Sequence, residues 1–140
     1  LYLIEEDLVK EIDSLNMKGL YQLNILQDFL YRNGDINDYQ NILSQSIISL
    51  SDGNGVFKMI QQSPIPDLDS TFLAVRILDQ LGLNDHIDIT AIANFTEACR
   101  EDYGFTIAPS DLLKEANIDI EADLKLTYEA LWLLDYCDSN

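Results

Sequence analysis

Basic residues are scarce in this chain. Eight Lys and Arg stand against 25 Asp and Glu, which gives a formal net charge of −17 at pH 7. The basic residues are scattered along the sequence: Lys10, Lys18, Arg32, Lys58, Arg76, Arg100, Lys114 and Lys125. Such a surface repels nucleic-acid phosphates and anionic lipid head groups, so we expect no nucleic-acid partner. The charge is compatible with a basic partner, with weakly bound divalent cations, or simply with solubility.

Histidine and cysteine are nearly absent as well. The single histidine, His86, falls in a short Asn-Asp-His-Ile loop, and Cys99 and Cys137 lack Cys-x-x-Cys spacing. A Cys-His zinc site therefore has too few ligands, and we expect neither a metal nor another cofactor. Each cysteine lies in a helical, mostly apolar context, where a free thiol behaves as a small hydrophobe. This context favours reduced thiols and a cytoplasmic protein, although the sequence alone is also compatible with a disulfide.

Long apolar runs and phosphate-binding loops are missing too. No stretch approaches the ~18 uninterrupted apolar residues of a membrane helix, and no basic segment precedes an apolar run as in a secretory signal. Residues 52–55, Asp-Gly-Asn-Gly, lack the Lys-Ser/Thr of a P-loop and the Glu of a calcium loop. We therefore interpret them as a turn. One loop histidine also offers no Ser-His-Asp set for nucleophilic catalysis.

Helical periodicity is what the chain has in abundance. Its 140 residues, 47% hydrophobic and 24% charged, fit one soluble globular domain spanning residues 1–140. Apolar residues recur at spacings of three and four, which predicts an all-α fold without strands. The six main predicted helices cover residues 3–16, 20–32, 37–50, 68–81, 88–101 and 121–137. A short helical turn is predicted over 110–115.

These helices alternate in character along the chain. The first, third and fifth are amphipathic, whereas the second, fourth and sixth are apolar around nearly their whole circumference. A helix that is apolar on nearly all sides is expected to be buried on nearly all sides. An inner ring of apolar helices surrounded by an outer ring of amphipathic helices satisfies this requirement. The pattern therefore predicts an α/α solenoid or toroid-like array.

An internal repeat supports the prediction. Residues 69–78 align with residues 125–134: Thr71 matches Thr127, 56 residues further on, and an aromatic residue follows each Thr. Ala then recurs three positions after each Thr, and Leu seven positions after it. A glycine-aromatic segment lies upstream of each copy, at 55–57 and at 104–105. The offset corresponds to about one helix pair with its loops.

A Gly-Phe loop followed by a Thr-aromatic-x-Ala-x-x-x-Leu helix resembles the repeat of squalene cyclases and of protein prenyltransferase β subunits. The resemblance covers about residues 20–137 and implies the α/α toroid of that superfamily. The family's cavity is closed by a full ring of about twelve helices, whereas this chain supplies about six. The resemblance therefore implies a partial toroid: an excerpt of a longer protein, a half-ring that forms a homodimer, or a subunit that docks onto another.

The segment Pro66-Asp-Leu-Asp-Ser-Thr-Phe-Leu-Ala74 is also similar to the DxDD-T-x-x-A signature of class II terpene cyclases. That similarity implies Asp69 as the proton donor, with Asp67 beside it in the motif. It further implies that inner-helix aromatics stabilise a carbocation or bind a hydrophobic ligand. These aromatics are Tyr21, Phe72, Tyr128 and Trp132. Ser70 replaces the final Asp of the signature, so part of the acidic network is missing.

Two other observations oppose catalysis. Asp67 and Asp69 follow Pro66 at the start of a predicted helix, where carboxylates commonly cap backbone N–H groups. The prenyltransferase zinc motif His-Thr-x-Tyr is also absent, because Leu126-Thr127-Tyr128 stands in its place. We therefore expect an accessory or binding domain that takes a hydrophobic ligand, a peptide or a protein where the inner helices converge. The alternative is a terpene-cyclase-like enzyme, or a piece of one, that uses Asp69 as a general acid on a polyene or prenyl diphosphate.

Overall fold

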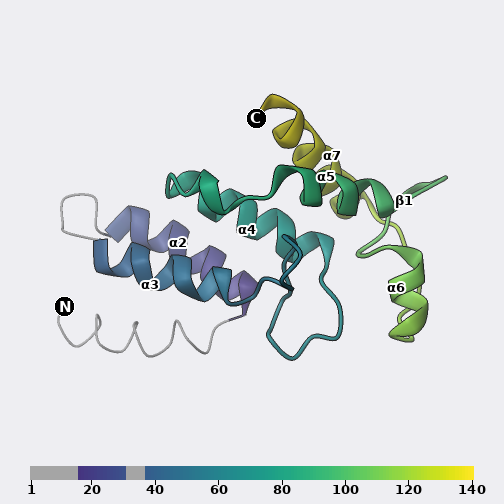
Figure 1. Ribbon diagram of the computed structural model, residues 1–140, viewed down its shortest axis with the longest axis horizontal. Coiled ribbons are helices and arrows are strands. Elements are labelled where there is room, and N and C mark those ends of the chain that lie inside the picture. The colour runs from purple at the N-terminus through teal and green to yellow at the C-terminus, as the bar shows by residue number, and fades with distance from the viewer. Residues whose placement is uncertain (1–15, 31–36) are drawn as a thin grey trace.

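The computed structural model describes residues 16–30 and 37–140 of the chain. These residues form six α-helices, one 3₁₀ turn and one two-stranded hairpin (Figure 1). The elements in chain order are α2 (Met17–Leu30), α3 (Asn37–Ile48), α4 (Leu68–Gln80), η1 (Asn84–His86), α5 (Ile89–Ala98), β1 (Arg100–Glu101), β2 (Gly104–Phe105), α6 (Ser110–Glu115) and α7 (Leu124–Ser139). The predicted helix over 3–16 lies outside the described residues.

The remaining helix predictions are confirmed, with ends that differ by a few residues. The expectation of a strand-free chain is wrong. The predicted helix 88–101 ends at Ala98, and Arg100 and Glu101 then pair antiparallel with Phe105 and Gly104. Gly104 adopts a φ of +143°, which favours glycine and lets the chain reverse at this point. Strands of two residues are too short to show an alternating apolar pattern, so periodicity cannot reveal them.

Aspartates begin three of the helices. Asp67, Asp88 and Asp123 each accept a backbone N–H bond from the residue three positions on, at 2.7, 3.0 and 2.7 Å. These bonds satisfy donors that the first helical turn leaves without partners. In the two repeat copies the Thr four residues after the cap also donates its hydroxyl to the cap carbonyl. The aligned segments therefore share the same local geometry at the start of α4 and α7.

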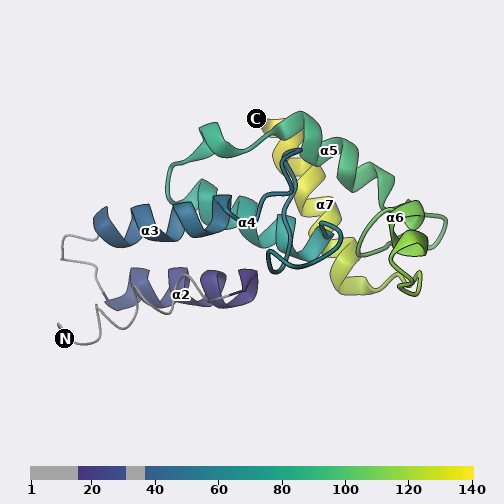
Figure 2. The ribbon, with the colours of Figure 1, turned by 60° about the horizontal axis from the view of Figure 1, so that its bottom comes forward.

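Helix α4 lies at the centre of the described structure and packs against both α2 and α7. Helix α3 packs on α2, and α5 packs on α7, while α6 lies at the end far from α2 and α3 (Figures 1 and 2). Ten of the thirteen α4 residues are buried, as its apolar circumference predicts. Its Val75, Ile77 and Leu78 join residues of the other elements in one continuous core.

Helix α7 departs from the prediction that it would be buried on nearly all sides. Leu126, Ala130 and Leu133 face the core, but Leu124 and Leu131 are 86% and 54% exposed. The sequence predicts the helix correctly and overestimates how much of it the rest of the described chain covers. Within residues 16–30 and 37–140, no helix is long and apolar enough to cross a membrane.

Candidate functional site

Equivalent positions of the internal repeat meet across the α4–α7 interface. Asp69 pairs with Lys125, Phe72 with Tyr128, and Arg76 with Trp132, and each pair has the same 56-residue offset as the two threonines. The three contacts lie on successive turns of both helices. Three equivalent pairs can meet in this way only if α4 and α7 run in the same direction. Antiparallel helices would bring only one such pair together. The repeat therefore sets which side chains form the candidate site.

Three of the four predicted ligand-binding aromatics surround one guanidinium. The Cζ atom of Arg76 lies 5.7 Å from the ring centroid of Tyr21, 5.6 Å from that of Phe72 and 5.7 Å from that of Trp132. These distances are typical of cation–π interactions. Tyr128 completes the set, because its ring meets Phe72 edge to face at 6.2 Å. We call Tyr21, Phe72, Tyr128, Trp132 and Arg76 the aromatic face.

The aromatic face is partly open to solvent. Phe72 is buried, Tyr21, Arg76 and Trp132 are partly buried, and Tyr128 is 58% exposed. Phe72 also meets Trp132 edge to face at 5.3 Å, so the two rings fix each other's orientation. The arrangement is an aromatic surface with a cation among its rings.

The predicted general acid, Asp69, lies beside this face and is 5% exposed. Its Oδ1 lies 3.2 Å from Lys125 Nζ, and its Oδ2 lies 3.9 Å from Lys18 Nζ. Burial lowers the pKa of Lys125, but the negative charges of Asp69 and Glu129 outweigh that effect and leave it raised. Two lysines, one from α2 and one from α7, therefore form ion pairs with Asp69.

Glu129 is a second buried carboxyl next to Asp69. Its side chain is 1% exposed, and neither carboxyl oxygen has a hydrogen-bond partner among the described residues. Lys125 Nζ lies 3.8 Å from Oε1. Burial, together with the neighbouring Asp69, raises the pKa of Glu129 to about 8. The pKa of Glu129 therefore lies above neutral pH, which favours the protonated form of its carboxyl.

Asp67, the other predicted acid, is the N-cap of α4. Its Oδ1 accepts the backbone N–H of Ser70 at 2.7 Å, and its Oδ2 accepts the Ser70 hydroxyl at 2.7 Å. Burial raises the pKa of Asp67 despite these two hydrogen bonds. Ser70, which replaces the last acid of the cyclase signature, is fully buried and serves as a capping partner instead. Asp67 is therefore engaged in starting the helix.

Arg76, Lys125 and Glu129 belong to this site although the sequence did not indicate them as site residues. A signal for Glu129 was present in the repeat, because Glu129 aligns with Leu73, an apolar core position. A carboxyl at a core position of a repeat needs a partner, and Lys125 lies one helical turn before it. Arg76 aligns with Trp132, which gave no hint that the two side chains stack on each other.

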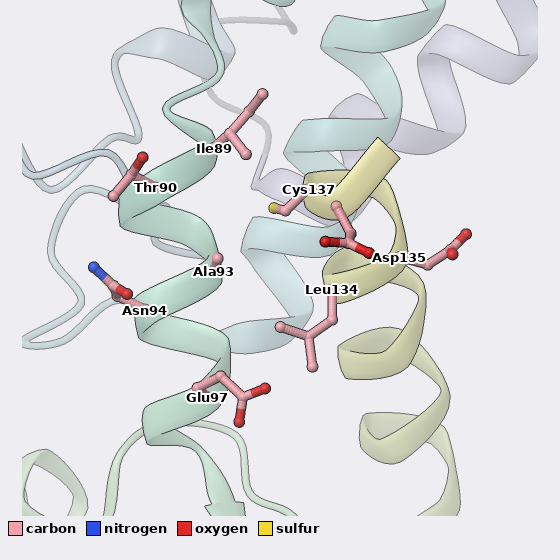
Figure 3. A pocket seen from close by; sticks show the side chains of 9 residues that line it. Ile89, Thr90, Ala93, Asn94, Glu97, Leu134, Asp135 and Cys137 are labelled. Atoms are coloured by element: carbon pink, nitrogen blue, oxygen red, sulfur yellow. The ribbon is translucent and has the colours of Figure 1, made fainter. Parts of the chain in front are cut away.

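Two surface pockets lie away from the predicted site residues. One, of about 600 Å³, lies between α5 and the end of α7, where Leu134 and Glu97 extend from facing helices (Figure 3). Its wall includes the Cys137 thiol, whose pKa is raised by burial, so the thiol is a poor nucleophile. The other, of about 580 Å³, lies between the β1–β2 turn and the start of α7.

The described part of the chain contains no candidate metal site. No group of three His, Cys, Asp or Glu residues within it is arranged to hold a metal ion. His86 lies exposed in the η1 turn. Cys99 is buried and Cys137 partly buried, and both are free thiols.

Comparisons with known protein families, with curated proteins and with solved structures find no match to this chain. The candidate site is therefore interpreted from its own geometry.

Proposed function

We propose that this chain is a binding domain without catalysis of its own, built as a partial α/α ring like that of terpene cyclases and prenyltransferases. Its binding surface is the aromatic face. The proposal depends on one observation: three of the four rings lie 5.6–5.7 Å from the guanidinium of Arg76. The aromatic residues thus come together in space, but their shared face is already occupied by a cation.

An occupied face supports binding over carbocation chemistry. Rings stabilise a substrate cation by offering their negative faces to an empty cavity. Here the guanidinium takes that position, and its positive charge would repel a carbocation. Lys125 Nζ also lies 3.2 Å from Asp69, so the predicted acid is already engaged in an ion pair.

The same geometry favours a particular ligand chemistry. Tyr128 is 58% exposed and Tyr21 and Trp132 are partly exposed, so these rings offer contact to an apolar or aromatic group beside Arg76. The guanidinium presents donors in a planar fork that matches a carboxylate. We therefore infer a ligand with an apolar body and an acidic group, either a small molecule or a peptide carboxylate. The negative charge elsewhere on the protein is largely screened beyond about 8 Å at physiological salt, so the local cation decides the contact.

Trp132 is the only tryptophan in the chain and lies in the aromatic face, so its fluorescence reports binding. The probe is decanoate, with the uncharged decanol as its comparison. We expect a saturable change in Trp132 emission with decanoate. Decanol and the Arg76→Gln variant should each weaken binding by about tenfold or more, since one charge-assisted hydrogen-bond pair is lost.

Arg100→Gln is the matched control, because Arg100 also lies over a ring, that of Phe105 at 4.7 Å, but away from the aromatic face. It should leave decanoate binding unchanged. Equal weakening by Arg100→Gln would show a nonspecific charge effect. Absence of saturable binding by the wild-type protein would reject the proposal.

A second candidate, a terpene-cyclase-like acid at Asp69, keeps one specific observation in its favour. The buried Glu129 beside Asp69 keeps its proton at neutral pH, with a pKa of about 8. A proton held in a buried carboxyl pair is what a general acid requires. In this candidate Asp69 would pass on a proton supplied by Glu129.

Turnover distinguishes the candidates. The protein is incubated with squalene and with a prenyl diphosphate, and the extract is analysed for cyclised or hydrolysed product. The binding proposal predicts none. Product that disappears in both Asp69→Asn and Glu129→Gln, with a rate that falls as pH rises through about 8, would establish the acid instead.

A further inference from the structure

We propose that the groove between the β1–β2 turn and the start of α7 binds a basic amphipathic helix of a partner protein. The groove has a volume of about 580 Å³. Its wall includes Tyr103 from the turn and Leu124 and Leu131 from α7. None of the five residues of the aromatic face lines this groove, so the inference goes beyond the proposed function of that face.

Large apolar side chains are exposed along this groove. Leu124 is 86% exposed, Tyr103 67% and Leu131 54%. Large apolar side chains gathered on one surface commonly mark a protein-binding site.

The spacing of these residues specifies the shape of the partner. Leu124, Thr127 and Leu131 line the groove and stand at i, i+3 and i+7, so they form a stripe along one face of α7. A second helix with apolar residues at the same spacing can lay its own stripe along this face, as amphipathic helices do in hydrophobic grooves. The β1–β2 turn, which carries Tyr103, forms the other wall.

The charged residues at the groove indicate the charge that a partner should carry. Glu101, Asp102 and Asp123 line it. Arg100 is its only basic lining residue, and Glu97 already binds that guanidinium through two hydrogen bonds of 2.9 and 3.1 Å. The groove therefore carries three acidic groups, of which Asp123 also caps α7, and little positive charge. Lys or Arg residues beside an apolar stripe complement it.

The same charges disfavour a second copy of this chain as the occupant. Two copies joined through this groove would place their acidic groups opposite one another, and each copy has a formal net charge of −17. Juxtaposed like charges oppose association. Charge thus selects a basic helix over a homodimer.

A synthetic helical peptide tests the inference. The probe is a short fluorescein-labelled peptide of Leu and Lys, with Leu along one helical face. A peptide of the same composition whose leucines do not share a face controls for simple charge attraction. We expect the fluorescence anisotropy of the first peptide to rise to saturation as protein is added. The second peptide should bind at least about tenfold more weakly.

Variants locate the site. Leu131→Asp and the milder Leu131→Gln should each weaken binding of the patterned peptide, the former by about tenfold or more. Ile60→Asp is the matched control, since Ile60 is 43% exposed and lies outside the groove. Circular dichroism confirms that each variant keeps its helices.

Three results would overturn the inference: equal binding of the two Leu-Lys peptides, unchanged binding by folded Leu131→Asp, or a wild-type dimer in light scattering that Leu131→Asp dissociates. The last would show that a second copy covers the groove. Arg76→Gln should not affect peptide binding, and Leu131→Asp should not affect decanoate binding. The two proposals therefore fail independently.

Discussion

Asp69 and Lys125 occupy equivalent positions in the two copies of the internal repeat, and their side chains form an ion pair with Oδ1 3.2 Å from Nζ. Opposite charges at equivalent positions fix the register of α4 against α7. The same Lys125 Nζ lies 3.8 Å from Glu129, so one cation serves two buried carboxyls. Lys125 is thus closer to Asp69 than Lys18 is, and it also lies near Glu129.

Removing Lys125 should destabilise the protein. Asp69 is nearly buried and would lose its closest cation, whereas the Lys125 side chain is 62% exposed. Breaking this half-exposed ion pair should cost more stability than breaking an exposed pair and less than breaking a buried one. We therefore expect Lys125→Met to lower the free energy of unfolding by about 1–2 kcal/mol. Lys18→Met, with its 3.9 Å contact, should cost less than about 0.5 kcal/mol in urea unfolding. Equal losses would contradict the assigned role of Lys125.

The protonation of Glu129 should make stability fall as pH rises. Its folded-state pKa of about 8 exceeds the ordinary value of 4.5, so the folded protein binds more protons than the unfolded chain between these values. The stabilisation is fully present below about pH 4.5 and is lost as pH rises through about 8. The slope has an upper limit of about 1.4 kcal/mol per pH unit.

The measurement compares urea unfolding of the wild type and Glu129→Gln across this pH range. The variant resembles the protonated carboxyl and should not show this part of the pH dependence. Glu121→Gln, at an exposed position, should behave as the wild type does. Parallel stability curves for wild type and Glu129→Gln would show that Glu129 is ionised at neutral pH.

The turn that follows α3 should not tolerate a side chain at Gly55. A Cβ atom there would lie 2.8 Å from Ala91 Cβ and 3.0 Å from Asp88 Cβ, and Gly55 has a φ of +94°. Gly53 has a similar φ of +90° but no atom within 4 Å of the Cβ position. Gly53→Ala should therefore cost about 1–2 kcal/mol through backbone strain alone. Gly55→Ala should cost clearly more, by thermal or urea unfolding, and an equal cost would show that α5 does not crowd this turn.

The two thiols should differ in reactivity. Burial raises the pKa of Cys99 to about 12, and Cys99 is fully buried. Cys137 is partly buried, and burial raises its pKa as well. With Ellman's reagent at about pH 8, the native protein should release one equivalent slowly, from Cys137, and a second only on unfolding. A Cys137→Ser protein that still reacts in the native state would contradict the burial of Cys99.

The helices could be predicted because each carries its signal locally. Apolar spacing marked the helical segments, and Asp67, Asp88 and Asp123 each begin a helix as caps. The β1–β2 hairpin could not be predicted, because two residues per strand carry no periodicity. The exposure of Leu124 could not be predicted either, because an apolar helical stripe has the same sequence pattern whether it faces a core or a partner.

The candidate site was predicted in its residue types but not in its pairings. The sequence indicated Tyr21, Phe72, Tyr128 and Trp132, and the structure brings them to one face. That Arg76 would lie among three rings depends on how α2, α4 and α7 pack. The distances from the Arg76 guanidinium to the three rings are set by tertiary contacts, which no single segment of the sequence encodes.

The most direct test of the binding account is a decanoate titration of the ¹⁵N-labelled protein followed by NMR. We expect the largest shifts at the indole N–H of Trp132 and the guanidinium N–H of Arg76, with saturation, and their loss in Arg76→Gln. Shifts spread over the whole surface, or none at these two side chains, would contradict the claim that the aromatic face is the binding site.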